Sequence, residues 1–254
     1  MSMLVAERYE KIVQLVNERG SIRVSELSEL CNVTEETIRR DLDRLELAGR
    51  LRRSHGGAIS VKELQPEVPF FEREVAHADE KKRIAEEAVK LIRPKQRILL
   101  DASTTAWYMS KLVPDIPLTV LTNSVQVITE LSGKEKIEVI ATGGRLAPSS
   151  LSFVGPLAER SLETYYVDKV FLSCKGVHLE RGISESSELQ ARLKQQMISI
   201  ADQAVLLADS SKFGIQSFAH VAGWSQLSAI ITDRKLPGEV RDLLTGQGLS
   251  VTLV

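Results

Sequence analysis

The sequence is poor in cysteine, in net charge and in long apolar runs. Its two cysteines, Cys31 and Cys174, are too few for a disulfide framework and too isolated for a metal site, so we expect buried thiols in a reducing compartment. The formal net charge of −1 gives no sign of non-specific affinity for nucleic acid. No apolar run approaches the roughly 18 residues of a membrane span, and the N-terminus lacks the profile of a signal peptide. We therefore expect a soluble, cytoplasmic protein that uses no membrane, metal or cofactor.

Length and composition predict two unequal domains. A chain of 254 residues that is 43% hydrophobic can bury a substantial core. The pairs Gln65-Pro66 and Val68-Pro69 cannot continue a helix, because a proline disfavours the helical conformation of the residue before it. The sequence thus predicts a first domain over residues 1–58, a linker over 59–79 and a second domain over 80–254.

Residues 34–58 predict a helix that runs into a short hairpin. Thr34 is placed to cap the helix, and Gly49 stands where a helix commonly stops. A turn at Gly56-Gly57 then follows a β-prone stretch. The apolar residues of the helix recur at the spacing of one buried face: Ile38, Leu42 and Leu45.

Arginine gathers on the outside of this segment. Residues 39–55 hold six arginines and no lysine against three acidic residues, and guanidinium groups suit bidentate contact with guanine edges and phosphates. Residues 1–60 as a whole carry ten basic and ten acidic residues, so any affinity for DNA must come from a local patch. A charged helix face is also often merely solvated, and the helix alone leaves both interpretations open.

The residues before this helix favour DNA binding. A helix ending near Arg19, an extended link at 21–23, a short helix from Val24 to Leu30 and a tight turn at 31–33 precede it. This is the order of a winged helix-turn-helix domain, whose second motif helix enters the major groove. We expect groove contacts from the helix, backbone or minor-groove contacts from the hairpin, and phosphate contacts from nearby hydroxyls and Arg39. The candidate DNA-contacting residues are Ser25, Thr34, Glu36, Thr37, Arg39, Arg40, Arg44, Arg52, Arg53 and His55.

Beyond residue 95 the sequence predicts an α/β domain with a mostly parallel sheet. Short apolar runs alternate with amphipathic helical patterns, which is typical of βαβ units. The expected strands are Arg97–Asp101, Leu118–Thr122, Ile137–Thr142, Lys169–Ser173, Ala204–Asp209 and Ala229–Thr232.

Polar residues follow five of these strands. Ligands of such sheets bind beyond the carboxyl ends of the strands, and helix starts, hydroxyls, lysine and arginine are what a phosphate group needs. Each segment alone is typical of caps and turns, but together they favour a phosphorylated ligand. The candidate residues are Asp101, Ser103, Thr104, Thr105, Thr122, Asn123, Ser124, Gly143, Gly144, Arg145, Lys175, Gly176, Asp209 and Lys212.

The motif VSELSELCNVTEETIRRDLDRLELAGRLRRSHGGA resembles the N-terminal domain of the DeoR-type bacterial repressors of sugar metabolism. The Asp-x-x-Thr-Thr, Thr-Asn-Ser, Gly-Gly and Asp-x-Ser-Lys-Phe-Gly segments are similar to the family's effector domain, so the resemblance covers essentially the whole chain. It implies a fold like that of ribose-phosphate isomerases and coenzyme A transferases, and a phosphorylated sugar or polyol as ligand. Ala102 and Ser103 depart from the glycine often found there, which narrows the pocket floor. The segment Ser184–Gln195 opens a helix with several carboxylates that could contact sugar hydroxyls, but capping and surface roles are the preferred assignment.

These features predict a repressor of a carbohydrate operon, with double-stranded operator DNA and a phosphosugar as partners. One short helix reads too few bases alone, so we expect a homodimer or homotetramer. An alternative is a sugar-phosphate isomerase with a fused DNA-binding segment, in which Asp101, Asp209 and Lys212 supply acid–base groups. We expect no catalytic residues, because one Asp and one Lys at a phosphate site more often balance charge. Two lone cysteines and four scattered histidines do not support a redox or metal sensor.

Overall fold

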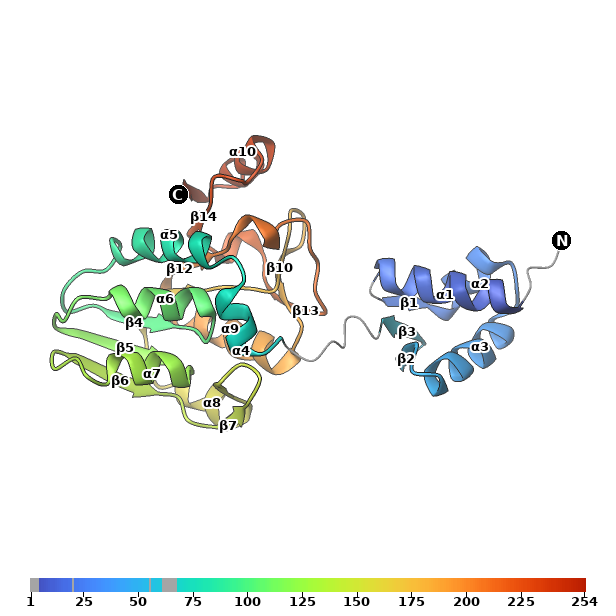
Figure 1. Cartoon of the computed structure of the whole chain (residues 1–254), viewed down its shortest axis with the longest axis horizontal. Coiled ribbons are helices and arrows are strands. Elements are labelled where there is room, and N and C mark those ends of the chain that lie inside the picture. Colours follow the sequence, from blue (N-terminus) through green and yellow to red (C-terminus); the bar gives the residue numbers. More distant parts are fainter. Residues whose placement is uncertain (1–4, 20, 55, 61–67) are drawn as a thin grey trace. The chain divides into compact units, whose positions relative to one another are not determined.

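The computed structural model describes residues 5–19, 21–54, 56–60 and 68–254. The chain divides into two compact units, Met1–Pro66 and Glu67–Val254, and both can be followed in Figure 1. His55, one of the candidate DNA contacts, lies outside the described residues. Among the helices of the described part, none is long and apolar enough to cross a bilayer.

The first unit is a winged helix-turn-helix fold, as predicted. Its helices are α1 (Val5–Arg19), α2 (Val24–Cys31) and α3 (Glu35–Leu47). Its strands are β1 (Ser21–Arg23), β2 (Leu51–Ser54) and β3 (Gly57–Ser60), in the antiparallel order β1-β3-β2. The expected extended link is therefore a third strand of the wing. Gly57 permits this pairing, because a Cβ there would lie 2.2 Å from the carbonyl oxygen of Ile22.

The predicted apolar face of α3 forms the core of this unit. Ile38, Leu42 and Leu45 are buried together with residues of α1 and α2. Thr34 caps α3, since its side chain accepts a hydrogen bond from the backbone N–H of Thr37. Gly49 follows the helix with φ of +68°, a conformation that glycine adopts without strain.

The second unit is built on a seven-stranded parallel sheet, which confirms the predicted α/β class. The strands follow the order β15-β14-β12-β9-β4-β5-β6. Six correspond to the predicted runs, with ends shifted by a few residues, and β15 was not predicted. Their bounds are β4 (Arg97–Leu100), β5 (Leu118–Thr122), β6 (Ile137–Ala141), β9 (Val167–Leu172), β12 (Ala201–Leu207), β14 (Ala229–Thr232) and β15 (Ser250–Leu253).

Side chains alternate between the two faces along each strand, so both faces of the sheet carry apolar residues and both are covered by helices. Leu100 and Phe171 pack with α5 (Ala78–Val89), α6 (Thr104–Leu112) and α7 (Val125–Leu131). Leu99 and Leu172 pack with α8 (Pro156–Leu162), α9 (Glu188–Ser199) and α10 (Gly238–Gly246). Figure 1 shows α5, α6 and α7 side by side along one face. The continuous apolar runs of the strands follow from burial on both faces.

Short strands lie outside the main sheet. β7 (Arg145–Ala147) pairs with β8 (Ser152–Val154), and β10 (Gly176–His178), β11 (Gly182–Glu185) and β13 (Ala219–Ala222) form a second small sheet. Two 3-10 turns, η1 (Ser210–Lys212) and η2 (Trp224–Gln226), complete the unit. Strands this short carry too little periodicity to stand out in the sequence.

The segment expected as a linker over residues 59–79 is partly folded. β3 extends to Ser60, and α4 (Phe70–Val75) and the start of α5 lie before residue 80. Pro69 precedes α4 as its N-cap residue, so a proline that was expected to break structure instead starts a helix. The ring of Phe70 is buried and lies 5.6 Å from that of Trp107, which anchors α4 on α6.

Candidate functional site

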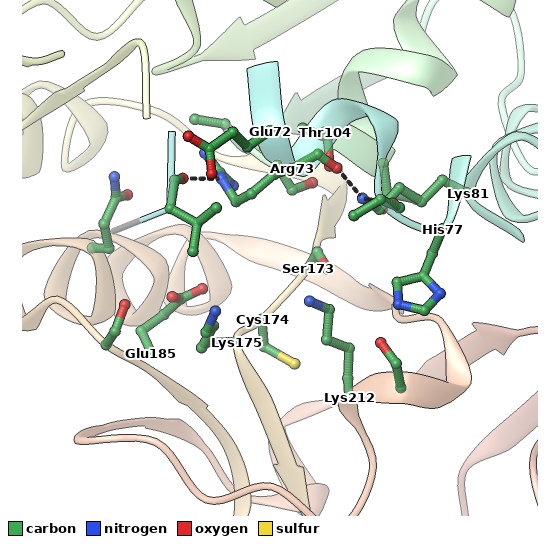
Figure 2. A pocket seen from close by; sticks show the side chains of 18 of the residues that line it. Glu72, Arg73, His77, Lys81, Thr104, Ser173, Cys174, Lys175, Glu185 and Lys212 are labelled. Atoms are coloured by element: carbon green, nitrogen blue, oxygen red, sulfur yellow. Dashed lines mark hydrogen bonds between the residues drawn. The ribbon is translucent and has the colours of Figure 1, made fainter. Parts of the chain in front are cut away.

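A cavity of about 260 Å³ lies in the second unit at the carboxyl edge of the main sheet. Its lining comes from the loops after β4, β9 and β12, from α9, and from α4 and α5. Figure 2 shows the side chains of these elements converging on one space. The structure therefore gathers at one place residues that are up to 144 positions apart, from Val68 to Lys212.

Five of the predicted ligand contacts line this cavity: Ser103, Thr104, Thr105, Lys175 and Lys212. Ser103 caps α6 by accepting a hydrogen bond from the N–H of Ala106 at 3.1 Å, and both threonines belong to the first turn of that helix. A helix N-terminus carries partial positive charge, which favours an anion. Ala102 also lines the cavity, so the side chains at 102 and 103 do occupy its wall.

A buried ion-pair network supports the cavity floor. The ammonium of Lys194 lies 3.1 Å from Asp101 and 2.5 Å from Glu185, and it donates to the carbonyl of Ser173 at 2.6 Å. Although burial by itself lowers the pKa of Lys194, Glu185 and Asp101 raise it above its ordinary value. The carboxylate of Asp101 also accepts two backbone hydrogen bonds, from Ser103 and Ser173, each at 3.0 Å. Asp101, a predicted ligand contact, is thus fully enclosed and holds two cavity loops in place.

Basic side chains outnumber acidic ones in the cavity lining. The lining includes Arg73, Lys81, Lys175, Lys194 and Lys212 against Glu72 and Glu185. Burial, and after it repulsion from Lys212, lowers the pKa of Lys81 to about 8. In Figure 2 the side chains of Lys212 and His77 point into the space that Lys81 also borders. An anion placed there would relieve the repulsion between the two lysines.

The predicted residues after β5 are not brought to the cavity wall. Thr122 donates its hydroxyl to the carbonyl of Leu100 at 2.7 Å, and Ser124 caps α7 by accepting from Val127 at 3.2 Å. Asn123 donates to the carbonyl of Phe153 at 3.0 Å, because β8 covers the end of β5. All three side chains are buried, and each takes part in one of these structural hydrogen bonds.

Five further candidates shape loops outside the lining. Gly143 and Gly144 adopt positive φ angles, and a Cβ on Gly144 would lie 3.0 Å from that of Ala158 in α8. Arg145 is exposed at the start of β7. Gly176 begins β10, where a Cβ would lie 2.5 Å from the carbonyl oxygen of Ile215. The side chain of the buried Asp209 accepts from the N–H of Ser211 at 3.1 Å and so caps η1.

The candidate list lacks the cavity residues that come from α4, α5 and α9. No residue of α4 was predicted as a ligand contact, because residues 59–79 were assigned to a linker. The available signal was the four-residue spacing of Arg73, His77 and Lys81 in a charged stretch. In the segment Ser184–Gln195, Glu185 and Gln190 line the cavity, so its assignment to surface roles was too narrow. The lining residues that were not predicted as ligand contacts are Val68, Glu72, Arg73, Ala76, His77, Lys81, Ala102, Ser173, Cys174, Glu185, Ser186, Gln190, Lys194 and Ser211.

Both thiols are free and buried, in agreement with the sequence-based expectation. Cys174 lines the cavity, and burial raises its pKa to about 12. It is therefore a neutral wall group near neutral pH rather than a nucleophile. Within the described residues, His, Cys, Asp and Glu form no cluster suited to a metal ion.

The outer face of α3 presents the predicted DNA contacts to solvent. Glu36, Arg39 and Arg40 are exposed, and Thr37 is half-buried beside Thr34. Arg39 lies 2.6 Å from Glu35, and Arg40 lies 3.5 Å from Glu36. The carboxylates of Glu35 and Glu36 therefore screen two of the arginines on this face. Exposed pairs of this kind are weak and can exchange for phosphate.

The remaining arginines link α3, α1 and the wing. Arg44 donates to the hydroxyl of Tyr9 at 3.3 Å, and Arg50 is paired in two hydrogen bonds with Glu10. Arg53 of β2 pairs with Asp43 of α3, so the wing is fastened to the helix. Ser25 in α2 and Arg52 in β2 are exposed.

Family models match both units of the chain. A model described as a DeoR-like helix-turn-helix domain matches residues 8–64, and one described as a DeoR C terminal sensor domain matches residues 76–234.

Whole-length relatives carry regulator names. An uncharacterised HTH-type transcriptional regulator of Bacillus subtilis is 58% identical, covering 95% of this chain and 94% of the relative. An L-fucose operon activator of Haemophilus influenzae is 41% identical, covering 92% and 94%. A putative aga operon transcriptional repressor of Escherichia coli O157:H7 is 36% identical, covering 98% and 94%.

Two solved structures show weaker similarity. The sorbitol operon regulator of Klebsiella pneumoniae has a TM-score of 0.43 and 12% identity, covering 93% of this chain and 98% of that one. A ribose 5-phosphate isomerase of Methanocaldococcus jannaschii has a TM-score of 0.41 and 19% identity, covering 54% and 55%. Similarity at this level supports no conclusion about activity.

Proposed function

The chain belongs to the DeoR family of transcriptional regulators, and from this premise we propose that it is a repressor of a carbohydrate-utilisation operon. Its first unit binds operator DNA, and the cavity of its second unit binds a phosphorylated sugar or polyol that controls this binding. Relatives named for a fucose operon and an aga operon support carbohydrate control. We place the protein in the cytoplasm, where its operator is, and propose a homodimer or homotetramer.

One observation carries the ligand proposal: Lys81 and Lys212 border the same cavity as the N-terminus of α6. A phosphoryl group needs cations and hydrogen-bond donors together, and this position supplies both. The polar side chains of Glu185, Ser186 and Gln190 also line the cavity and suit sugar hydroxyls. The lining thus offers groups that bind an anion and groups that bind hydroxyls.

Substitution of Lys212 tests this proposal. Lys212→Ala removes a cation from the cavity, so we expect the response of operator binding to phosphosugars to be lost while binding to DNA alone is kept. Calorimetric titration with pentose, hexose and polyol phosphates, beside gel-shift assays on the promoter region, measures both properties. Lys136→Ala is the matched control, because this exposed lysine precedes β6 at the opposite end of the strands. An unchanged response in Lys212→Ala would remove Lys212 from the site.

The isomerase alternative requires a carboxylate able to accept a proton. Of the two carboxylates predicted for this role, Asp101 is bound to Lys194, and Asp209 caps η1 outside the cavity lining. We therefore propose ligand binding without turnover. An isomerase assay run beside the titrations separates the two functions, since product formed at a rate above background would contradict the regulator-only proposal.

A further inference from the structure

One wall of the cavity is built by the first residues of the second unit. α4 and its flanking residues supply Val68, Glu72, Arg73, Ala76 and His77. The second unit begins at Glu67, so this wall is its first described part.

Lys81 connects this wall to the cavity. Its ammonium, on α5, donates hydrogen bonds to the backbone carbonyls of Arg73 and of Ala76, the latter at 2.6 Å. Ala76 is the C-cap residue of α4, where carbonyls lack partners within the helix. An ammonium has three N–H donors, and the two carbonyls use two of them. The same side chain lines the cavity and is repelled by Lys212.

The two ends of α4 are held in different ways. At its start, the buried Phe70 packs on Trp107, and its backbone N–H donates to the carbonyl of Ser149 at 2.7 Å. There, Arg73, a cavity side chain, also donates from Nε to the carbonyl of Val68 at 2.9 Å and lies over the ring of Phe70. Near its end, Tyr108 donates to the carbonyl of Glu74 at 3.3 Å, and Lys81 binds the carbonyls of Arg73 and Ala76. The contacts of Lys81 depend on a charge that an anion in the cavity can change.

We propose that Lys81 couples the cavity to α4, with its third N–H donated to an anion in the cavity while its other two hold the end of this helix. An anion between Lys81 and Lys212 offsets their repulsion and favours the charged form of Lys81. The hydrogen bonds from Lys81 to α4 then strengthen, because charge-assisted hydrogen bonds are stronger than neutral ones. α4 is held more firmly when the cavity is occupied. This inference rests on the proposed function, since it takes anion binding as given and adds the element of the second unit that responds to it.

Hydrogen exchange on the full-length protein tests the coupling, with inorganic phosphate at tens of millimolar as the probe. At pH 9, where a pKa of about 8 leaves Lys81 mostly neutral, we expect phosphate to slow exchange of the amides of residues 68–77 in wild type by up to about tenfold, because it restores the charge on Lys81. In Lys81→Met, we expect this slowing to be lost at phosphate concentrations that saturate the variant by calorimetry. Lys90→Met is the matched control, since Lys90 is exposed and pairs with Glu87 on the same helix.

The outcomes separate this inference from the proposed function. Wild type that binds phosphate without slowing residues 68–77, or Lys81→Met that slows them as wild type does, would overturn the coupling. The wild-type comparison decides the matter even where Lys81→Met unfolds, and Lys81→Arg, which is charged with or without phosphate, should show little further slowing. If neither inorganic phosphate nor any phosphosugar of the panel binds wild type, the proposed function itself fails.

Discussion

Lys81 shows how one side chain acquires its properties from residues far away in the sequence. Its ammonium is buried, faces Lys212, and is bound to two backbone carbonyls of the preceding helix. Burial and like charge both disfavour the ammonium form, so its pKa falls to about 8. The cavity therefore contains a cation whose charge depends on pH close to neutrality.

This pKa predicts a pH-dependent ligand affinity. An anion favours the charged form of Lys81, so binding takes up a proton and is strongest below pH 8. As the pH rises above that value, we expect affinity for a phosphosugar to fall, by up to about tenfold per pH unit. A phosphomonoester has its second pKa near about 6, so the ligand itself keeps its charge over this range. Calorimetric titration between neutral pH and pH 9 measures the slope.

Lys81→Met serves as the control for this slope, because it removes the titrating group. Its affinity should be lower than that of wild type near neutral pH and should change little across the same range. A wild-type affinity that stays constant to pH 9 would contradict the position assigned to the anion.

At the scale of elements, α3 and the wing divide the work of DNA recognition. Arg40 is exposed on α3 beside Glu36, whereas Arg53 lies on β2 and pairs with Asp43. We expect Arg40→Ala to cost about 1–3 kcal/mol on the operator and to relax discrimination between sequences. Arg53→Ala should weaken operator and random duplexes alike, because wing residues meet the backbone.

Competition binding with operator and random duplexes at fixed salt measures both effects. Arg19→Ala is the control, since Arg19 ends α1 and lies outside the proposed interface. Equal losses on both duplexes for Arg40→Ala and Arg53→Ala would contradict the division between base reading and backbone contact.

A buried ion pair joins α1 to α3. The guanidinium of Arg8 lies 2.6 Å from the carboxylate of Asp41, and both side chains are nearly enclosed. Asp41→Ala leaves a buried charge without its partner, which we expect to destabilise the first unit by about 3 kcal/mol. Faster hydrogen exchange of α1 and α3 amides would report this loss.

Two comparisons locate that effect. Glu35→Ala, which breaks the exposed pair with Arg39, should cost less than about 1 kcal/mol. Both tryptophans, Trp107 and Trp224, belong to the second unit, so tryptophan fluorescence should show that its unfolding is unchanged. If hydrogen exchange in α1 and α3 is as slow in Asp41→Ala as in wild type, the ion pair contributes no net stability.

At the scale of the whole molecule, we expect two or four chains to bind one operator. A single α3 reaches few base pairs, and paired half-sites raise specificity. Sedimentation of the protein with a promoter duplex should give two or four chains per duplex. Inserting about 5 base pairs between half-sites places them on opposite faces of the DNA and should weaken binding. One chain per duplex, insensitive to such spacing, would contradict the proposed assembly.

Local patterns predicted most of the elements. The apolar stripe of α3, its cap at Thr34 and its stop at Gly49 lie within one stretch of chain, so their spacing carries the information. The six apolar runs became strands of the parallel sheet for the same reason. The short strands β7, β8, β10, β11 and β13 have no such pattern and form through contacts with the rest of the unit.

The two kinds of fold, the arginine-rich face of α3 and the family resemblance could all be predicted from the sequence, because periodicity, capping and motif spacing are local properties. Which polar residues meet at the cavity could not. Asp101 and Lys212 are both polar residues after strands, yet Asp101 is enclosed and paired with Lys194, whereas Lys212 lines the cavity. Which side chains line a cavity depends on how elements distant in the sequence pack, and that packing places Lys81, from the start of the predicted second domain, beside residues more than 100 positions away.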